Sequence, residues 1–269
     1  MDVGSTAGML LAIDVGNTHT VVGVFQGEDL LHDWRVSTMR GATVDELAAQ
    51  HEQILQLRGG SLTDIRYLVV ASGVPALTAG YRELAAKYLD ESALIVGPGV
   101  RTGVSLAIDN PHELGADRLV NALAAYRRTG GACIVVDFGT ATTFDCISAS
   151  GEYLGGAIAP GIEISLDALA GRAARLLKVD LQRPERAIGK STVECMQSGV
   201  IYGTVAMVDG LVARLAEEIG EDVTVIATGG LAELIAPLSD EIDEHDPLLT
   251  LQGLRMVHTL NVDDRGERR

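Results

Sequence analysis

The feature of this sequence that most constrains its fold is a pattern that occurs once in each half of the chain. Residues 11–25 read LAIDVGNTHTVVGVF, and residues 134–148 read IVVDFGTATTFDCIS. Each stretch begins as an apolar strand that ends at an aspartate, Asp14 or Asp137, and continues through a glycine and a polar cluster into a second strand. Such a turn between two apolar runs is typical of a β-hairpin. Because the two aspartates are 123 residues apart in a chain of 269, the pattern predicts an internal duplication.

The periodicity of the remaining sequence places each hairpin at the start of a larger α/β unit. The first half predicts strands over 9–15, 19–25, 29–38, 67–72 and 93–97, and helices over 43–57, from Pro75, and over about 111–128. The second half predicts strands over 132–138, 141–148, 152–159 and 222–230, with helices between them and up to about residue 261. Three antiparallel strands followed by alternating helices and strands are typical of a mixed sheet that is covered by helices.

The composition predicts a soluble globular protein that has neither a membrane nor a nucleic acid as its partner. Hydrophobic residues make up 47% of the chain, and no apolar run approaches the roughly 18 residues that span a bilayer. The first residues, MDVGSTAG, lack the basic and apolar segments of a signal peptide. The net charge is −16, without the basic cluster that nucleic-acid binding requires. Three cysteines without a framework spacing favour reduced thiols, and therefore the cytoplasm.

The residue types of the two hairpins are those of a phosphate-binding turn. A glycine lets the backbone approach a ligand closely, and consecutive amides in a turn form a concavity for an anion. Hydroxyl and amide side chains add donors, and they come from Asn17, Thr18, Thr20, Thr140, Thr142 and Thr143. An aspartate beside a phosphate requires a cation between them or a water that it orients. Either hairpin alone would more often be an ordinary turn, but the duplication favours two phosphate sites that bind one triphosphate.

Several longer stretches resemble known kinases. DVGNTHT, DFGTATTFD and ATGG (residues 227–230) resemble the two phosphate motifs and the adenosine motif of the acetate and sugar kinase, Hsp70 and actin superfamily. More narrowly, DNPHELGADRLVNALAAY, GGAIAPGI and GKSTVECMQSGVIYG resemble the type III pantothenate kinases, and the similarity runs from about Met9 to Asn261. The resemblance implies an α/β fold of two RNase H-like domains with the active site in the cleft between them. The expected domains are 9–126 and 127–261, with disordered termini at 1–8 and 262–269.

The same resemblance implies the reaction and its participants. Type III pantothenate kinases use ATP to phosphorylate pantothenate to 4′-phosphopantothenate, which is the entry step to coenzyme A. The expected cofactors are Mg²⁺ with the ATP and a monovalent cation, K⁺ or NH₄⁺. The expected assembly is a homodimer that holds pantothenate near its subunit interface.

The family motifs assign roles to particular positions. ATP binding falls to Asp14, Val15, Gly16, Asn17, Thr18, His19, Thr20, Val21, Thr140, Gly229 and Gly230. Pantothenate binding falls to Gly115, Ala116, Asp117, Arg118 and Thr192. Asp117 is the expected general base, and Asp137 the expected ligand of the monovalent cation. One position departs from the family, since Ile108 stands where many members have a tyrosine, and a contact to pantothenate is then missing.

Simpler interpretations exist for several of these residues. From periodicity alone, Asp117 is an ordinary acidic residue near a helix N-terminus, where the helix dipole favours it. Thr192 follows Ser191, which forms a capping-box pattern with Glu194, and it is then simply the first helical residue. Two other functions also fit the hairpins: a kinase of the same superfamily that acts on a sugar or on acetate, and a regulator that binds ATP without transferring phosphate. The three intact aspartates, Asp14, Asp117 and Asp137, count against the regulator.

A long apolar helix near the end of the chain predicts a subunit interface. The stretch from Cys195 to Leu215 is apolar or small around most of its circumference, so it requires cover on more than one side. Gly199, Gly203 and Gly210 are costly inside a helix, and close approach of another backbone would explain them. The hypothesis is a two-fold interface beside the pantothenate site. Cover by a neighbouring helix of the same chain is the alternative.

Overall fold

The computed structural model describes residues 8–89, 91–172 and 179–262. Nearly all of the two termini that were expected to be disordered, 1–8 and 262–269, lies outside these residues. The chain divides into two compact units, and neither of them is a single continuous segment. Unit 1 comprises Met1–Gly103, His112–Leu123 and Thr250–Arg269, and unit 2 comprises Val104–Pro111 and Ala124–Leu249.

These units differ from the continuous domains that the sequence suggested, 9–126 and 127–261. The C-terminal helix belongs to unit 1, although it follows the second half of the chain. The short stretch from Val104 to Pro111 belongs to unit 2, although it lies in the first half. The reason is packing, since a helix joins the sheet that its apolar face covers, whichever half of the sequence supplied it.

Unit 1 is built on a five-stranded mixed sheet. Neighbouring strands β1, β2 and β3 are antiparallel, whereas β4 and β5 run parallel to β1. In sheet order the strands are β3 (Asp29–Ser37), β2 (His19–Gln26), β1 (Met9–Val15), β4 (Ile65–Ser72) and β5 (Leu94–Ile95). The predicted strands are therefore confirmed, and β5 is shorter than expected. A parallel neighbour needs a crossover, and a helix supplies each one.

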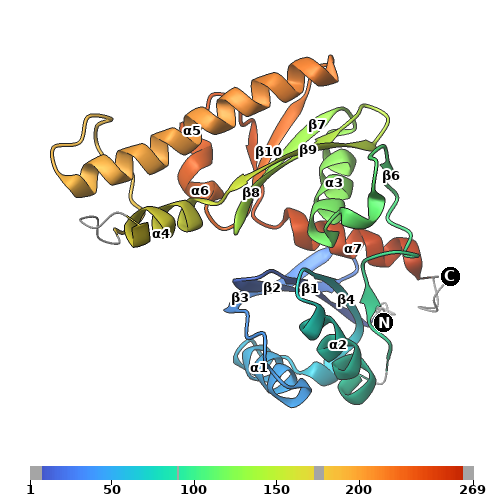
Figure 1. Cartoon of the computed structure of the whole chain (residues 1–269). Helices are drawn as coiled ribbons and strands as arrows, with labels where there is room; N and C mark the ends of the chain where they lie inside the picture. Colours follow the sequence, from blue (N-terminus) through green and yellow to red (C-terminus); the bar gives the residue numbers. More distant parts are fainter. Residues whose placement is uncertain (1–7, 90, 173–178, 263–269) are drawn as a thin grey trace, which may run out of the picture. The chain divides into compact units, whose positions relative to one another are not determined.

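Two helices, α1 (Val44–Leu57) and α2 (Pro75–Leu84), lie on the same side of this sheet, as Figure 1 shows. Thr43 caps α1 through the predicted capping box with Glu46, an arrangement that is worth about 1 kcal/mol. The apolar face of each helix packs on one face of β1 and its neighbours, where Leu11, Ile13 and Val15 are all fully buried.

The opposite face of the unit 1 sheet meets the C-terminal helix α7 (Leu249–Asn261). A Cβ at Gly23 of β2 would lie 3.0 Å from the Cδ1 atom of Leu251, so the helix packs closely on the strand. Helix α3 (Ala116–Thr129) contacts α7 in turn, because a Cβ at Gly253 would lie 2.1 Å from the carbonyl oxygen of Val120. Only glycine permits this approach of the two helices.

Unit 2 repeats the topology of unit 1. Its strands follow the order β11 (Glu244–His245), β10 (Thr224–Thr228), β7 (Cys133–Phe138), β8 (Ala141–Ile147), β9 (Glu152–Pro160) and β6 (Ser105–Leu106). Strand β8 pairs antiparallel with β7 and with β9, whereas β10 and β11 run parallel to β7, and β6 runs parallel to β9. Apart from β6, the order matches that of unit 1, because β9, β8, β7, β10 and β11 correspond to β3, β2, β1, β4 and β5. The internal duplication that the two hairpins predicted is confirmed.

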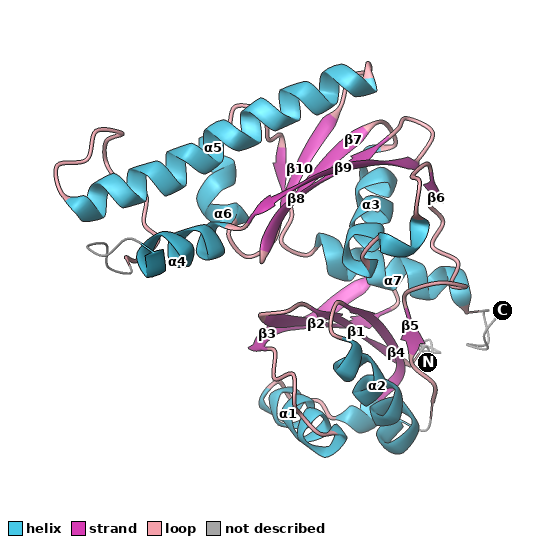
Figure 2. Ribbon diagram, in the orientation of Figure 1, coloured by secondary structure: helices cyan, strands magenta, loops and turns pink. Residues whose placement is uncertain are grey.

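The helices of unit 2 are α4 (Ile162–Arg172), α5 (Thr192–Ile219) and α6 (Ala232–Ile235). Figure 2 shows α5 as a long rod that extends past the strands, with α4 beside its N-terminal part. One face of α5 enters the core of unit 2 through Ile201, Val205, Val208 and Val212. Ser191 and Glu194 form the predicted capping box, and Gly220 ends the helix in a left-handed conformation with φ +72°.

Helix α5 is also the one helix among the described residues that is long and apolar enough to cross a bilayer by length and composition. The sequence expectation that no stretch approaches this limit overlooked it. The core helices of globular proteins can be equally long and apolar, and part of α5 packs on the sheet of unit 2. Within the most apolar 18-residue stretch of α5, however, only 22% is buried inside the protein, so much of the helix surface is uncovered.

Four short helical turns complete the described chain. They are η1 (Leu62–Asp64), a π-helical turn η2 (Ala85–Leu89), η3 (Pro111–Glu113) and η4 (Ala236–Leu238).

Candidate active site

The first predicted phosphate hairpin lies in unit 1, where β1 turns into β2. The turn closes through a hydrogen bond of 3.0 Å from the Gly16 amide to the carbonyl oxygen of His19. Asp14 is half-buried at the end of β1, and Asn17, Thr18 and His19 are exposed at the tip. A Cβ at Gly16 would come within 2.9 Å of the His19 oxygen, so a glycine suits this turn. The polar tip is therefore presented to solvent on a rigid strand pair.

The loop that follows β3 stiffens this hairpin from the side. The Thr38 hydroxyl donates to the Gly16 carbonyl at 2.8 Å, and its oxygen lies 3.0 Å from the hydroxyl oxygen of Thr20. Arg40 donates from Nη2 to Oδ1 of Asn17 at 2.9 Å. Thr20 is only 3% exposed, so its hydroxyl supports the turn from within. The sequence expected this hydroxyl as a donor to phosphate, and it did not single out Thr38 or Arg40.

Asp117 and Arg118 lie in the first turn of α3, in the part of the helix that belongs to unit 1. Asp117 is exposed and Arg118 is half-buried. The carbonyl of Gly115 accepts the Leu119 amide at 3.2 Å, which begins the helix. A Cβ at Gly115 would lie 2.4 Å from Oδ1 of Asp117, so the carboxylate folds back over this glycine. The glycine thus sets the direction of the exposed carboxylate.

The second hairpin lies in unit 2, between β7 and β8, and two further turns press against it. The Gly139 amide donates to the Ala141 carbonyl at 3.1 Å. A Cβ at Gly161 would lie 2.2 Å from the carbonyl oxygen of Thr140, and one at Gly229 would lie 2.4 Å from Oδ1 of Asp137. The structure therefore brings together three residues that the sequence assigned to ATP or a cation, namely Asp137, Thr140 and Gly229.

The residues at this second hairpin suit a cation that is shared with phosphate. The described part of the chain contains no group of three or more His, Cys, Asp or Glu side chains that would hold a metal ion by themselves. A hard cation that accompanies ATP takes carboxylate oxygens together with phosphate oxygens. Asp137, half-buried at the end of β7, offers one such carboxylate beside a turn of backbone amides.

Thr192 lies on a separate pocket of unit 2, which has a volume of about 580 Å³. The pocket is open to solvent and is lined by α4, the first half of α5 and Pro160 at the end of β9, and most of its surface is apolar. Pro160 pairs with Ala141 across the sheet, so the pocket begins beside the second hairpin. Its size is that of a small-molecule site. Its lining carries three hydroxyl side chains, of which Thr192 and Ser165 are exposed and Thr204 is half-buried.

Comparison with known proteins identifies the family. A model of the family described as "Type III pantothenate kinase" matches residues 10–214. The type III pantothenate kinase of Moorella thermoacetica is 53% identical over 253 residues, which cover 94% of this chain and all of that protein. The chain belongs to the type III pantothenate kinase family. The enzyme of the same name from Streptomyces avermitilis is 52% identical over 262 residues and is covered to 99% of its length.

Solved structures support the fold of this type III pantothenate kinase family member. The ethanolamine utilization protein EutJ from Carboxydothermus hydrogenoformans has a TM-score of 0.54 at 16% identity, with 93% of this chain and 89% of that chain covered. An activator of 2-hydroxyisocaproyl-CoA dehydratase from Clostridium difficile, solved with bound ADPNP, has a TM-score of 0.51 at 13% identity, with 92% and 91% covered. At these identities the likeness concerns the fold alone, and it is consistent with duplicated RNase H-like domains.

The structure also shows residues to which the family motifs assigned no role. Gly161 approaches the hairpin even more closely than Gly229 does, since a Cβ would lie 2.2 Å from the Thr140 oxygen at Gly161 and 2.4 Å from Oδ1 of Asp137 at Gly229. Its signal in the sequence was the stretch GGAIAPGI. Thr38 and Arg40 had no signal, because their contacts to the first hairpin bridge 22 and 23 residues of sequence. Ile108, the position that departs from the family, is half-buried, and its Cγ2 atom faces Gly155 of β9.

Proposed function

We infer that this protein phosphorylates pantothenate with ATP, which is the first step of coenzyme A biosynthesis. The observation that carries this conclusion is the family match over residues 10–214, together with relatives of the same name at 52–53% identity over 94% of the chain. The fold agrees with a kinase, because each unit presents a hairpin with a carboxylate and a tight glycine turn.

We propose that both hairpins bind phosphate groups of ATP. Backbone amides in a glycine turn attract anions at little conformational cost. In the first hairpin, Asn17, Thr18 and His19 are exposed around Gly16, and their side chains add donors. In the second, Thr140 is exposed in the turn, and Gly229, which precedes Gly230, lies against Asp137, where the adenosine end of the nucleotide is expected. The ADPNP in the Clostridium difficile activator supports nucleotide binding by this fold.

We propose that Asp117 accepts the proton of the pantothenate hydroxyl during transfer. In phosphoryl transfer, the protein mainly positions the reactants and neutralises charge, and one carboxylate orients and deprotonates the nucleophile. Asp117 is exposed at the first turn of α3, where a substrate can reach it, and the absence of a side chain at Gly115 leaves room for its carboxylate. Arg118, the next residue, suits the carboxylate of pantothenate.

We propose that two cations accompany the ATP. Mg²⁺ would bridge phosphate oxygens and offset their charge, with Asp14 as a carboxylate that reaches it through water. A monovalent cation, K⁺ or NH₄⁺, would lie at Asp137. This second ion is expected because a tetra-anionic ATP between acidic hairpins leaves excess negative charge, and the chain as a whole carries −16.

We propose that pantothenate occupies the pocket between α4 and α5, and that a second subunit helps to enclose it. The pocket is mostly apolar, with Thr192 at its edge. Nothing in the described chain lies within 4 Å of a Cβ built at Gly199, Gly203 or Gly210, so no neighbouring helix among the described residues packs against these glycines. Their surface is open to a partner, and a second copy of α5 is the partner that the homodimer hypothesis requires.

The expected location of this enzyme is the cytoplasm. Cys133 and Cys146 are buried free thiols, and Cys195 is an exposed one. Free thiols of this kind suit a reducing compartment.

The test of the reaction is ADP formation with purified protein, Mg-ATP and K⁺, followed in the presence and absence of pantothenate. The inference expects ADP only with pantothenate, and a product heavier by one phosphate in mass spectrometry. Glucose, N-acetylglucosamine and acetate serve as matched acceptors. ADP formation with one of these and not with pantothenate would favour another kinase of the superfamily, whereas nucleotide binding without any acceptor turnover would favour a regulator.

A further inference from the structure

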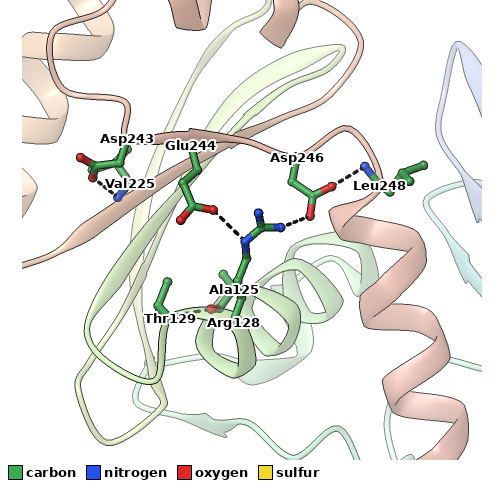
Figure 3. Close-up of polar contacts among 8 residues, drawn as sticks. All are labelled: Ala125, Arg128, Thr129, Val225, Asp243, Glu244, Asp246 and Leu248. Carbon is green, nitrogen blue, oxygen red and sulfur yellow. Dashed lines mark hydrogen bonds and ion pairs between the residues drawn. The ribbon is translucent and has the colours of Figure 1, made fainter. Parts of the chain in front are cut away.

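Arg128, near the C-terminal end of α3, binds two carboxylates at once, as Figure 3 shows. Its Nη1 atom lies 2.6 Å from Oδ2 of Asp246, and its Nε atom lies 2.7 Å from Oε2 of Glu244. The Asp246 side chain is 7% exposed, compared with 40% for Glu244. Ion pairs between exposed side chains contribute little, and desolvation strengthens them. The contact with Asp246 is therefore the one that can hold α3.

Asp246 is itself fixed by the backbone around it. Its Oδ1 atom accepts the Leu248 amide at 2.8 Å, just before α7 begins at Leu249. Its own amide donates to the Ala227 carbonyl of β10 at 2.9 Å. Asp246 thus joins the edge of the unit 2 sheet to the start of α7. Arg128 attaches the end of α3 to this junction.

The helix that Arg128 anchors is the one that carries Asp117 and Arg118. Both ends of α3 are held at different places, because residues up to Leu123 belong to unit 1 and residues from Ala124 onward belong to unit 2. Arg128 follows Asp117 by eleven positions, which corresponds to about 16 Å along the helix. A helix of this length is stiff, so a displacement of its anchored end changes the direction of its first turn.

We propose that Arg128 is a positioning residue for phosphoryl transfer, which holds α3 so that Asp117 keeps its catalytic orientation. The proposal rests on the assignment of Asp117 as the base. Arg128 itself touches neither substrate nor nucleotide in this account. Its loss releases the end of α3 and leaves the Asp246 carboxylate in a poorly hydrated place. A misplacement of about 1 Å can cost up to about 100-fold in rate, so an effect on turnover is expected even from this distance.

The test compares Arg128→Ala with Arg127→Ala, its neighbour on the same helix turn. Arg127 is also exposed, and no ion pair involving it is found among the described residues. We expect Arg128→Ala to lower kcat by about 10-fold or more while the KM for ATP changes less than about two-fold, the pattern of an interaction lost in the transition state. Arg127→Ala should keep wild-type kinetics. Hydrogen exchange in the peptide that contains Asp117 should quicken in Arg128→Ala only.

Two further variants separate positioning from stability. In Arg128→Ala/Asp246→Asn the unpaired carboxylate is gone and the asparagine still accepts the Leu248 amide, so thermal stability should return while kcat stays low. Arg128→Lys, which keeps the charge at Asp246, should recover part of kcat. A kcat that returned with stability in the double variant would overturn the proposal, as would an Arg128→Ala enzyme within about two-fold of wild type. Asp117→Asn is measured alongside: if that variant were fully active, the base assignment would fail instead.

Discussion

Gly229 lies directly against Asp137: a Cβ at Gly229 would come within 2.4 Å of Oδ1 of that carboxylate and 2.6 Å of the Phe138 amide nitrogen. The φ angle of Gly229 is +91°, a conformation that disfavours any L side chain. The turn after β10 and the turn after β7 therefore fit together only through a glycine. Any side chain here would move Asp137 or the backbone that is proposed to bind ATP.

We therefore expect Gly229→Ala to raise the KM for ATP by about 10-fold or more, because uniform binding to the nucleotide is lost. Gly220 provides the matched control, since its φ is +72° and nothing lies within 4 Å of a Cβ there. Gly220→Ala should cost about 1 kcal/mol of unfolding free energy from backbone strain alone and leave the KM unchanged. Equal KM values for the two variants would contradict a nucleotide site at Gly229.

Mg²⁺ and the monovalent cation should have separate effects on ADP formation. Chelation of Mg²⁺ should abolish ADP formation, whereas replacing K⁺ by Tris at constant ionic strength should lower it and leave Mg-ATP in place. The physical reason is that Mg²⁺ offsets only part of the charge of ATP between two carboxylates. Asp137→Asn should weaken the dependence on K⁺ in the same assay. Full activity without any small monovalent cation would remove Asp137 from this role.

A charge in the middle of α5 should separate the subunits. We expect the wild type to have a mass near twice 28.3 kDa in light scattering at micromolar concentration, and Gly203→Glu to have the monomer mass and low activity. Glutamate favours a helix over glycine by about 0.5–1 kcal/mol, so unfolding would not explain the loss. Gly41→Glu, at an open loop position of unit 1, is the control and should remain dimeric.

A wild-type enzyme that is monomeric and fully active would contradict the interface. Pelleting of the wild type with lipid vesicles, abolished by Gly203→Glu, would instead assign the uncovered face of α5 to a membrane. Its length and composition permit that outcome.

Acid should destabilise the protein through His51. This side chain is fully buried between β3 and α2, with Nε2 3.1 Å from the Tyr81 hydroxyl, and burial lowers its pKa from 6.5 to about 4. Between these two values the unfolded chain binds a proton that the folded chain does not, so stability falls as the pH falls through this window. At pH 5 the expected loss from this group is about 2 kcal/mol of unfolding free energy relative to pH 7.

Denaturant unfolding at pH 7 and pH 5 measures this loss. His51→Gln should remove about 2 kcal/mol from the difference between the two pH values, whatever it does to stability at pH 7. An unchanged pH dependence in His51→Gln would mean that another group carries the effect.

The duplicated fold was predictable from the sequence because its signals are local. An apolar run that stops at an aspartate, a glycine and a polar cluster specify a hairpin within 15 residues, and Thr43 with Glu46 specifies a helix start within four. Strands β6 and β11 were not predicted, since two residues each are too short for any periodicity and exist through pairing with β9 and β10. Helix α7 belongs to unit 1 because of contacts such as that between Gly253 and Val120, and no local sequence pattern predicts such a contact.

The candidate site was predictable only in part for the same reason. The family motifs singled out Asp137 and Gly229, and the structure shows that the two residues touch. They did not single out Thr38 or Arg40, which support the first hairpin from the loop after β3, nor Arg128, whose partner Asp246 is 118 residues away. Side chains that act through a neighbour leave no signature of their own in one sequence.

The measurement that tests the central claim most directly is the turnover of Asp117→Asn with Mg-ATP, K⁺ and saturating pantothenate, beside its ATP affinity from equilibrium binding. Asparagine keeps the size and loses the base, so we expect kcat to fall by about 10²- to 10⁴-fold while ATP binds nearly as in the wild type. Asp33→Asn, at an exposed position of β3, should behave as the wild type. An Asp117→Asn enzyme with near-wild-type turnover would contradict the account.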